Sequence, residues 1–388
     1  DLAAFVSKSC HACPEPRALR SGGGKPLTRR LAALAVAAAL MAGTAVPAFA
    51  EVYDIGAGSI TIEANGDGTA KVTQNENVND KDDDVKVTGS NEVTGNTVDI
   101  INNTDDDLKV TLSDVTITDT KGDAAVSVSG TGDTTIELDG SNTLESSGWH
   151  AGLERNEEKD SAGNVVSGKL TIQDEDKNGS LDATGGYGGA GIGGANLNNS
   201  GAIEITGGTI TANGTLDGAG IGGGGSGGDG TVIISGGNIT AQGGSSDNPN
   251  AICGAGIGGG GGYGNATVTI TGDAVIEEAT GGGGCAGIGN GYYNSKTDIT
   301  ISGNAEVKNA QGGAQGAGIG GGGFGGTGTV TITDNAKVDN ATGGEGAAGI
   351  GSGVFGNVTV NISGNATVNA EGGANGAGIG GGYASAGD

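Results

Sequence analysis

The stretch GAGIGGGG, residues 218–225, contains the spacing G-x-G-x-x-G at Gly218, Gly220 and Gly223. In dinucleotide-binding proteins, this spacing opens a helix whose N-terminus faces a pyrophosphate group. Here the chain continues as GGGGSGGDG, and a run of glycine is a very poor helix former. The stretch therefore lacks the local context of a phosphate-binding loop, and its glycines need another explanation.

The core A-G-I-G recurs seven times along the chain. Its isoleucines are Ile192, Ile221, Ile257, Ile288, Ile319, Ile350 and Ile379, at intervals of 29, 36, 31, 31, 31 and 29 residues. An earlier, degenerate copy, HAGLE, places Leu153 in the same role. Seven copies of one cofactor loop would be redundant, whereas a supersecondary unit stacked along an axis repeats with such a period. The glycines are therefore predicted to be architectural.

Each period holds two further segments with the two-residue alternation of a half-buried strand. In the segment 267–282, Val268 and Ile270 alternate with threonines, and Ile276 faces inward again after a turn. Ile288 of the next A-G-I-G core is expected to complete the interior of the coil. Three short strands in each period predict an all-β fold, a right-handed parallel β-helix (solenoid) with about 30 residues per coil.

Composition and pattern divide the chain into four segments. These are residues 1–24, a leader or upstream sequence; 25–50, a signal peptide; 51–147, acidic N-terminal coils; and 148–388, Gly-rich β-helix repeats. The signal peptide is indicated by Arg29 and Arg30, a short apolar run and a final AFA pattern. The last repeat stops at GAGIGGGYASAGD without a capping element, so we expect the natural chain to continue past Asp388.

The charge of the chain limits its partners. The 388 residues contain 18 Lys and Arg against 45 Asp and Glu, for a net charge of −27. Removal of residues 1–50 takes away 6 basic and 2 acidic residues, which leaves 12 against 43 and a net charge of −31. Such a chain repels nucleic acid and anionic membrane surfaces. The apolar run is shorter than the roughly 20 residues that span a bilayer. We therefore expect no nucleic-acid partners and no membrane span. With the signal peptide, we expect a monomer that is secreted or held on the cell surface.

Much of the chain from residue 51 onward resembles a family of secreted bacterial carbohydrate-binding β-helix proteins found in cellulolytic and gut bacteria. The similar stretches are LSDVTITDT, ELDGSNTLESSGWHAGLE, LTIQDEDKNGSLDATGGYGGAGIGG and the repeated GAGIGGG. The resemblance implies a pectate-lyase-like β-helix that binds calcium and cell-wall or host polysaccharide. It implies no catalytic activity. An adhesin or structural stalk without glycan binding is the alternative function.

Catalysis is disfavoured by the shortage of basic side chains. A polysaccharide lyase needs a base beside calcium-binding carboxylates. After residue 50 the chain has one histidine, His150, and one arginine, Arg155. We therefore expect no enzyme activity, and a lyase or glycoside hydrolase of the same fold is the second alternative.

Acidic side chains in the N-terminal half are candidates for binding calcium. The stretch DEDKNG, residues 174–179, resembles the first half of a calcium loop, although Gly185 stands where a closing Glu is needed. The candidate metal ligands are Asp105, Asp106, Asp107, Asp174, Asp176 and Asn178. The alternative for residues 174–179 is a solvated turn between two strands.

Aromatic residues are scarce, yet they recur four to six positions after the isoleucine of the A-G-I-G core. They are Tyr263, Tyr292, Tyr293, Phe324, Phe355 and Tyr383. Stacked coils would align these rings along one corner and offer apolar faces to sugar rings. Alternatively, the rings stack on each other and cover glycine-rich turns. Trp149 is a further candidate for sugar stacking, against a role in a structural corner.

Two cysteines precede neighbouring A-G-I-G cores. Cys253 and Cys285 lie four and three residues before Ile257 and Ile288. On adjacent coils they would be about one strand spacing apart, within the range that a disulfide tolerates. The sequence leaves open a disulfide bond or a pair of small buried thiols.

Overall fold

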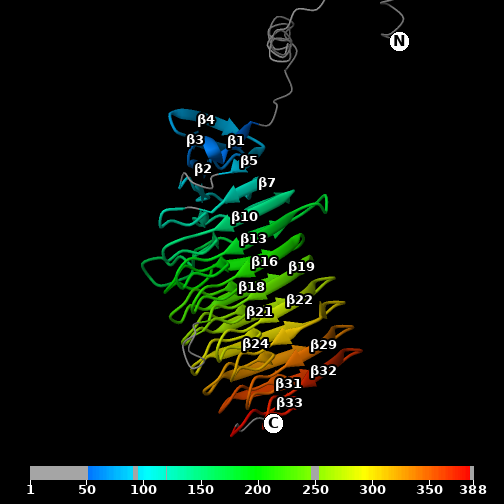
Figure 1. Ribbon diagram of the computed structural model, residues 1–388. Coiled ribbons are helices and arrows are strands. Elements are labelled where there is room, and N and C mark those ends of the chain that lie inside the picture. Colours follow the sequence, from blue (N-terminus) through cyan, green and yellow to red (C-terminus); the bar gives the residue numbers. More distant parts are fainter. Residues whose placement is uncertain (1–50, 91–94, 119, 246–252, 385–388) are drawn as a thin grey trace, which may run out of the picture. The chain divides into compact units, whose positions relative to one another are not determined.

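A computed structural model describes residues 51–90, 95–118, 120–245 and 253–384 (Figure 1). These residues belong to one compact unit, Ala50–Asp388. The expected leader and signal peptide, residues 1–50, lie outside the described residues. From the described N-terminal strands to β33, the chain winds as a stack of similar coils (Figure 1).

Equivalent strands of successive coils pair in parallel and in register. One coil consists of β21 (Ala266–Ile270), β22 (Val275–Thr280) and β23 (Ile288–Gly289). Val268 pairs with Ile299, and Ile288 pairs with Ile319, in each case 31 positions later. The chain therefore folds as a right-handed parallel β-helix with about 30 residues per coil. This confirms the fold that the repeat predicts.

The first two strands of each coil form two stacks. The first stack contains β5 (Val85–Ser90), β7 (Leu108–Ile117), β9 (Thr134–Asp139), β12 (Leu170–Gln173), β15 (Ala202–Ile205), β18 (Gly230–Ile234), β21, β24 (Lys296–Ile301), β28 (Thr327–Ile332) and β31 (Asn357–Ile362). The second contains β10 (Ser141–Glu145), β13 (Ser180–Thr184), β16 (Thr209–Asn213), β19 (Asn238–Gln242), β22, β25 (Glu306–Val307), β26 (Ala310–Gln311), β29 (Lys337–Thr342) and β32 (Thr367–Glu371). Because β7 pairs with both β9 and β10, the two stacks form one sheet.

The third strand of each coil forms a separate sheet. It contains β2 (Ile60–Ala64), β6 (Val98–Ile101), β8 (Val126–Ser129), β11 (Leu153–Glu154), β14 (Ile192–Gly193), β17 (Ile221–Gly222), β20 (Ile257–Gly258), β23, β27 (Ile319–Gly320), β30 (Ile350–Gly351) and β33 (Ile379–Gly380). The antiparallel strands β3 (Ala70–Gln74) and β4 (Asn77–Asp82) extend this sheet beyond β2. β1 (Val52–Asp54) pairs with β5, and a 3-10 turn, Ile55–Ala57, follows β1.

Apolar side chains from the three stacks fill the interior of the coils. Val268, Ile270, Ile276 and Ile288 are each at most 1% exposed, as the repeat pattern predicts. Their equivalents in neighbouring coils belong to the same continuous core. Most of the stabilisation therefore comes from ladders of aliphatic side chains that run from coil to coil along each of the three stacks.

The A-G-I-G core is a tight loop around a two-residue strand. In the β20 coil, the Ala255 N–H donates to the Gly259 carbonyl over 3.0 Å. Gly258 has a φ of +131°, and a Cβ there would overlap the Gly289 carbonyl of the next coil. The glycines thus allow a positive φ and a close approach of neighbouring backbones. This confirms that they serve the architecture of the coil.

Candidate binding surface

The loop around each A-G-I-G core brings the turns on its two sides together. In each pair of successive coils, the donor is the backbone N–H of the residue four positions after the isoleucine of the later coil. The acceptor is the carbonyl of the residue four positions before the isoleucine of the earlier coil. These bonds are Gly261 to Asp217 (2.6 Å), Gly323 to Gly284 (2.8 Å), Val354 to Gln315 (3.3 Å) and Tyr383 to Gly346 (2.6 Å). The two turns of successive coils therefore share one corner of the β-helix.

A row of aromatic rings runs along this corner, and we call it the aromatic ladder. It consists of Tyr263, Tyr293, Phe324, Phe355 and Tyr383. Successive ring centroids are 5.9 Å, 5.9 Å, 5.8 Å and 6.3 Å apart. The structure thus brings together five of the rings that the sequence places after the A-G-I-G core, one on each of five coils.

The rings of the aromatic ladder contact each other and also face solvent. Tyr263, Phe355 and Tyr383 are 65%, 51% and 55% exposed. Tyr293 and Phe324 are half-buried against the residues beneath them. Each ring therefore contacts its neighbour, as the alternative of mutual stacking expects, while part of the ladder stays accessible to solvent. Sugar binding by these rings stays a prediction.

Tyr292 requires a correction, because it does not face solvent with the other rings. It is only 2% exposed, and its hydroxyl donates to Gln315 Oε1 over 2.9 Å. Its ring packs edge-on against Tyr293 and Phe324. Burial, and secondarily the nearby Tyr293, raise the pKa of its phenol. Tyr292 therefore supports the ladder from below, and Gly284 leaves room for it, since a Cβ there would overlap the Tyr292 ring.

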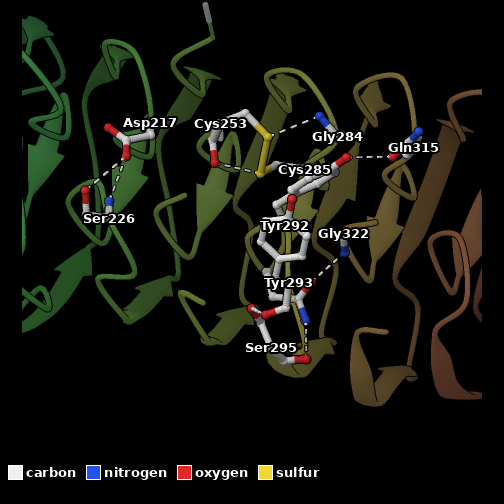
Figure 2. The surroundings of a disulfide bond; sticks show 11 residues. Asp217, Ser226, Cys253, Gly284, Cys285, Tyr292, Tyr293, Ser295, Gln315 and Gly322 are labelled. Carbon is white, nitrogen blue, oxygen red and sulfur yellow. Dashed lines mark hydrogen bonds between the residues drawn. A yellow bond between two sulfur atoms is a disulfide. The ribbon is translucent and has the colours of Figure 1, made fainter. Parts of the chain in front are cut away.

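Cys253 and Cys285 lie directly beneath the aromatic ladder and form a disulfide bond (Figure 2). Their Cα atoms are 6.0 Å apart, and both residues are fully buried. The Gly284 N–H donates to Cys253 Sγ over 3.1 Å. The two cysteines and Tyr292 make up a small core of their own, separate from the aliphatic interior. This core fixes the base on which Tyr293 and Phe324 rest.

The backbone is left-handed at two of the five ladder residues. Phe324 and Phe355 have φ angles of +56° and +58°, and the equivalent residues Leu197 and Ser226 have φ angles of +70° and +58°. A bulky L-residue is unfavourable in this region by about 1–2 kcal/mol. Such strain persists only where surrounding contacts hold it, and it is concentrated at functional sites. The chain thus places large exposed rings at positions where glycine would be free of strain.

A pocket of about 530 Å³ opens beside the last three rings of the ladder. Its apolar wall consists of Phe324, Phe355 and Tyr383. Its polar side chains come from the opposite turn, on successive coils: Gln315, Glu345 and Asn375. Sequence reasoning missed these three residues, because nothing in the repeat shows that the turns before and after the A-G-I-G core meet.

Trp149 lies apart from the aromatic ladder. It is 58% exposed, and its ring centroid is 5.6 Å from that of Tyr187 on the next coil, which is 61% exposed. Both residues precede their A-G-I-G-type core, whereas the ladder rings follow theirs. Sequence reasoning missed Tyr187 as a candidate for sugar stacking. Its position five residues before Ile192 is the signal that could have identified it. Trp149 and Tyr187 form a second, smaller aromatic surface.

The candidate calcium ligands lie in two exposed turns. Asp174 and Asp176 each accept a hydrogen bond from the Asn178 backbone N–H, at 3.1 Å and 3.2 Å. Asp107 accepts one from the Thr135 hydroxyl, and Asp105 and Asp106 are exposed beside it. Within the described ranges, no group of three or more His, Cys, Asp or Glu side chains is arranged to hold a metal ion. Calcium binding by these residues stays a prediction.

The basic residues considered for catalysis have structural partners. The Arg155 side chain is fully buried and donates to the carbonyls of Val128, Gly130 and Gly168 over 2.6–3.1 Å. Burial lowers the pKa of its guanidinium. His150 Nδ1 lies 2.8 Å from Glu154 Oε2, and this hydrogen bond raises the pKa of the imidazole.

By its fold, the chain is a parallel β-helix protein. Five segments match the family model described as Beta helix repeat, namely residues 203–225, 232–261, 299–323, 330–354 and 360–383. The chain is similar to that family over these segments, each of which contains one A-G-I-G core and strand residues before it. Comparison with curated proteins and with solved structures finds no match. In the described part of the chain, no helix is long and apolar enough to cross a membrane.

Proposed function

We propose that the protein is a non-catalytic polysaccharide-binding β-helix, and that the aromatic ladder is the surface that contacts the glycan. The observation that carries this proposal is the unbroken contact of five rings on five successive coils, three of them at least half exposed. Rings of this kind pack against the C–H faces of pyranoses, while nearby polar groups bond their hydroxyls. Because the rings recur once per coil, they suit a repeating polymer.

Two further observations support a binding role. The pocket beside the last three rings places the polar side chains of Gln315, Glu345 and Asn375 where they can bond the hydroxyls of a sugar. Tyr292 and the disulfide beneath the ladder hold its middle rings in place, and a rigid platform loses less entropy on binding. We place this activity outside the cell, where a disulfide is stable.

The non-catalytic part of the proposal rests on the engagement of the basic side chains. Arg155 bonds three backbone carbonyls and has no exposed surface, so it is not accessible to a substrate. His150 is held by Glu154. Neither residue belongs to the pocket beside the aromatic ladder. Assays for lyase and hydrolase products on the bound polysaccharides should therefore detect no turnover.

The binding role is tested by glycan arrays and by pull-down with insoluble polysaccharides, using the full chain. The variant Tyr263→Ala/Phe355→Ala/Tyr383→Ala removes the three exposed ladder rings. Trp149→Ala/Tyr187→Ala is the matched control, because it removes exposed rings outside the ladder. We expect at least tenfold weaker binding for the first variant and unchanged binding for the control, since each stacked ring contributes roughly 0.5–1.5 kcal/mol.

Two outcomes would contradict this proposal. Unchanged binding by the ladder variant would place the glycan on another surface, and loss in the control would identify the Trp149–Tyr187 pair as that surface. No binding of any glycan by the parent chain would favour the alternative of an adhesin or structural stalk.

A further inference from the structure

The space between the two turns of the shared corner is filled differently along the β-helix. In the β17 coil, the Asp217 carboxylate spans it and accepts the Ser226 N–H over 2.8 Å (Figure 2). In the next two coils the disulfide and the Tyr292 ring occupy it. The Tyr292 hydroxyl donates a hydrogen bond to Gln315, and the filled part of the space ends at this residue.

Beyond Gln315 the same space opens into the pocket of about 530 Å³. Its two sides differ in chemistry. Phe324, Phe355 and Tyr383 line one side, and Gln315, Glu345 and Asn375 line the other. Both rows advance by one residue per coil. A sugar ring has apolar C–H faces and polar hydroxyl edges, and it matches this arrangement. Its face would contact the aromatic row, and its edge would contact the amide and carboxylate groups.

The charge of the pocket restricts which sugar it can take. Its lining residues include no Lys, Arg or His, and its single ionisable carboxylate is Glu345, which is exposed to solvent. A carboxylate accepts hydrogen bonds from neutral hydroxyls but repels another carboxylate at short range. The net charge of −27 adds to this repulsion.

We propose that this pocket is a sugar subsite of the ladder that selects uncharged pyranoses, and that Glu345 is the residue that excludes uronates. The inference rests on the proposed polysaccharide binding and deepens it. The aromatic wall of the pocket is placed to stack on a sugar ring, and the Glu345 carboxylate discriminates against negatively charged sugars. Replacement of Glu345 by a basic residue should therefore change the class of glycan that binds while the aromatic wall stays in place.

The test measures the affinity of the full chain for two probes by calorimetry. One is a neutral β-1,4-linked hexasaccharide of glucose, and the other is an oligogalacturonate of the same length, each in the presence of a chelator. We expect the parent chain to bind the neutral probe and to bind the uronate at least tenfold more weakly. In Glu345→Lys, uronate affinity should rise by about tenfold or more, because repulsion becomes attraction. Glu345→Gln should fall between the two.

Glu278→Lys is the matched control, because it makes the same charge change at an exposed site outside the pocket. A comparable gain of uronate binding in this control would attribute the effect to net charge and overturn the role of Glu345. Equal binding of both probes by the parent would also overturn it. If Phe355→Ala weakens neutral binding but Glu345→Lys gains no uronate affinity, the ladder function stands and the inference falls. If neither probe nor any arrayed glycan binds, both fall.

Discussion

Phe324 and Phe355 occupy the same position on neighbouring coils, with ring centroids 5.8 Å apart and φ angles of +56° and +58°. Each ring is thus held in a backbone conformation that L-residues rarely adopt. The contact between them runs along the stacking direction of the β-helix. Leu197 and Ser226 have the same backbone conformation at the equivalent position without a ladder ring, so ring stacking and backbone strain are separate features that substitutions can distinguish.

The strain at Phe355 predicts a difference between two substitutions. Phe355→Ala removes the ring but keeps a Cβ in left-handed backbone, whereas Phe355→Gly removes both. We expect the glycine variant to be more stable than the alanine variant by about 1 kcal/mol. Both should lose binding to the same extent. Urea unfolding followed by circular dichroism measures this difference, and an alanine variant as stable as the glycine variant would show that the backbone is unstrained.

The buried guanidinium of Arg155 predicts a large effect on stability. Arg155→Met removes the side-chain donors to the carbonyls of Val128, Gly130 and Gly168, of which the Gly130 carbonyl still accepts the Gly168 N–H. We expect a loss of about 2–5 kcal/mol, because each buried carbonyl left unsatisfied costs about 1–3 kcal/mol. Lys81→Met is the control, because Lys81 pairs with Asp67 at the surface, where solvent screening leaves such pairs little effect on stability. The urea midpoints of both variants check this. Equal small shifts would mean that the guanidinium is dispensable.

The hydrogen bond between His150 and Glu154 predicts a pH dependence of stability. The pKa of His150 is raised in the folded chain above its usual value of about 6.5. Its stabilising contribution is therefore fully present below about pH 6.5 and is lost as the pH rises through the folded pKa. Thermal unfolding of the parent should shift to lower temperature as the pH rises above about 6.5, and His150→Gln should reduce that shift. An identical pH profile in the variant would rule out this residue as its source.

The disulfide predicts resistance to reduction in the folded state. Because Cys253 and Cys285 are fully buried, treatment of the folded protein with a thiol reductant that is removed before heating should leave the unfolding temperature unchanged. Reduction after denaturation, or the variant Cys253→Ala/Cys285→Ala, should cost about 3–4 kcal/mol for a separation of 32 residues. Peptide mapping without reductant should find the two cysteines in one cross-linked fragment. Two unlinked cysteine peptides would favour the alternative of buried thiols.

The fold follows from the sequence because its decisive signal is repeated. The isoleucine of the A-G-I-G core recurs with nearly constant spacing, and Val268 and Ile270 alternate with threonines as their equivalents do in later coils. Each copy is weak evidence alone, but a stacked fold is the arrangement in which all copies have equivalent surroundings. The burial of these side chains confirms it.

The candidate site follows from the sequence only in part. The alignment of Phe324 with Phe355 depends on the period, which the sequence shows. The burial of Tyr292 depends on the space at Gly284 in another turn, and the polar row with Glu345 depends on contacts between turns of successive coils. Such contacts depend on the loop geometry of the A-G-I-G core, which a pattern of residue types does not specify.

Ile288, Ile319 and Ile350 pair in register at intervals of 31 residues, so the gene that encodes this chain can gain or lose whole repeats. Unequal recombination between two such repeats adds or deletes one coil, and every flanking strand still meets an equivalent partner. Each event also adds or deletes one ring of the ladder. The length of the aromatic surface can therefore evolve by copy number, without any substitution at the sites that keep the coil folded.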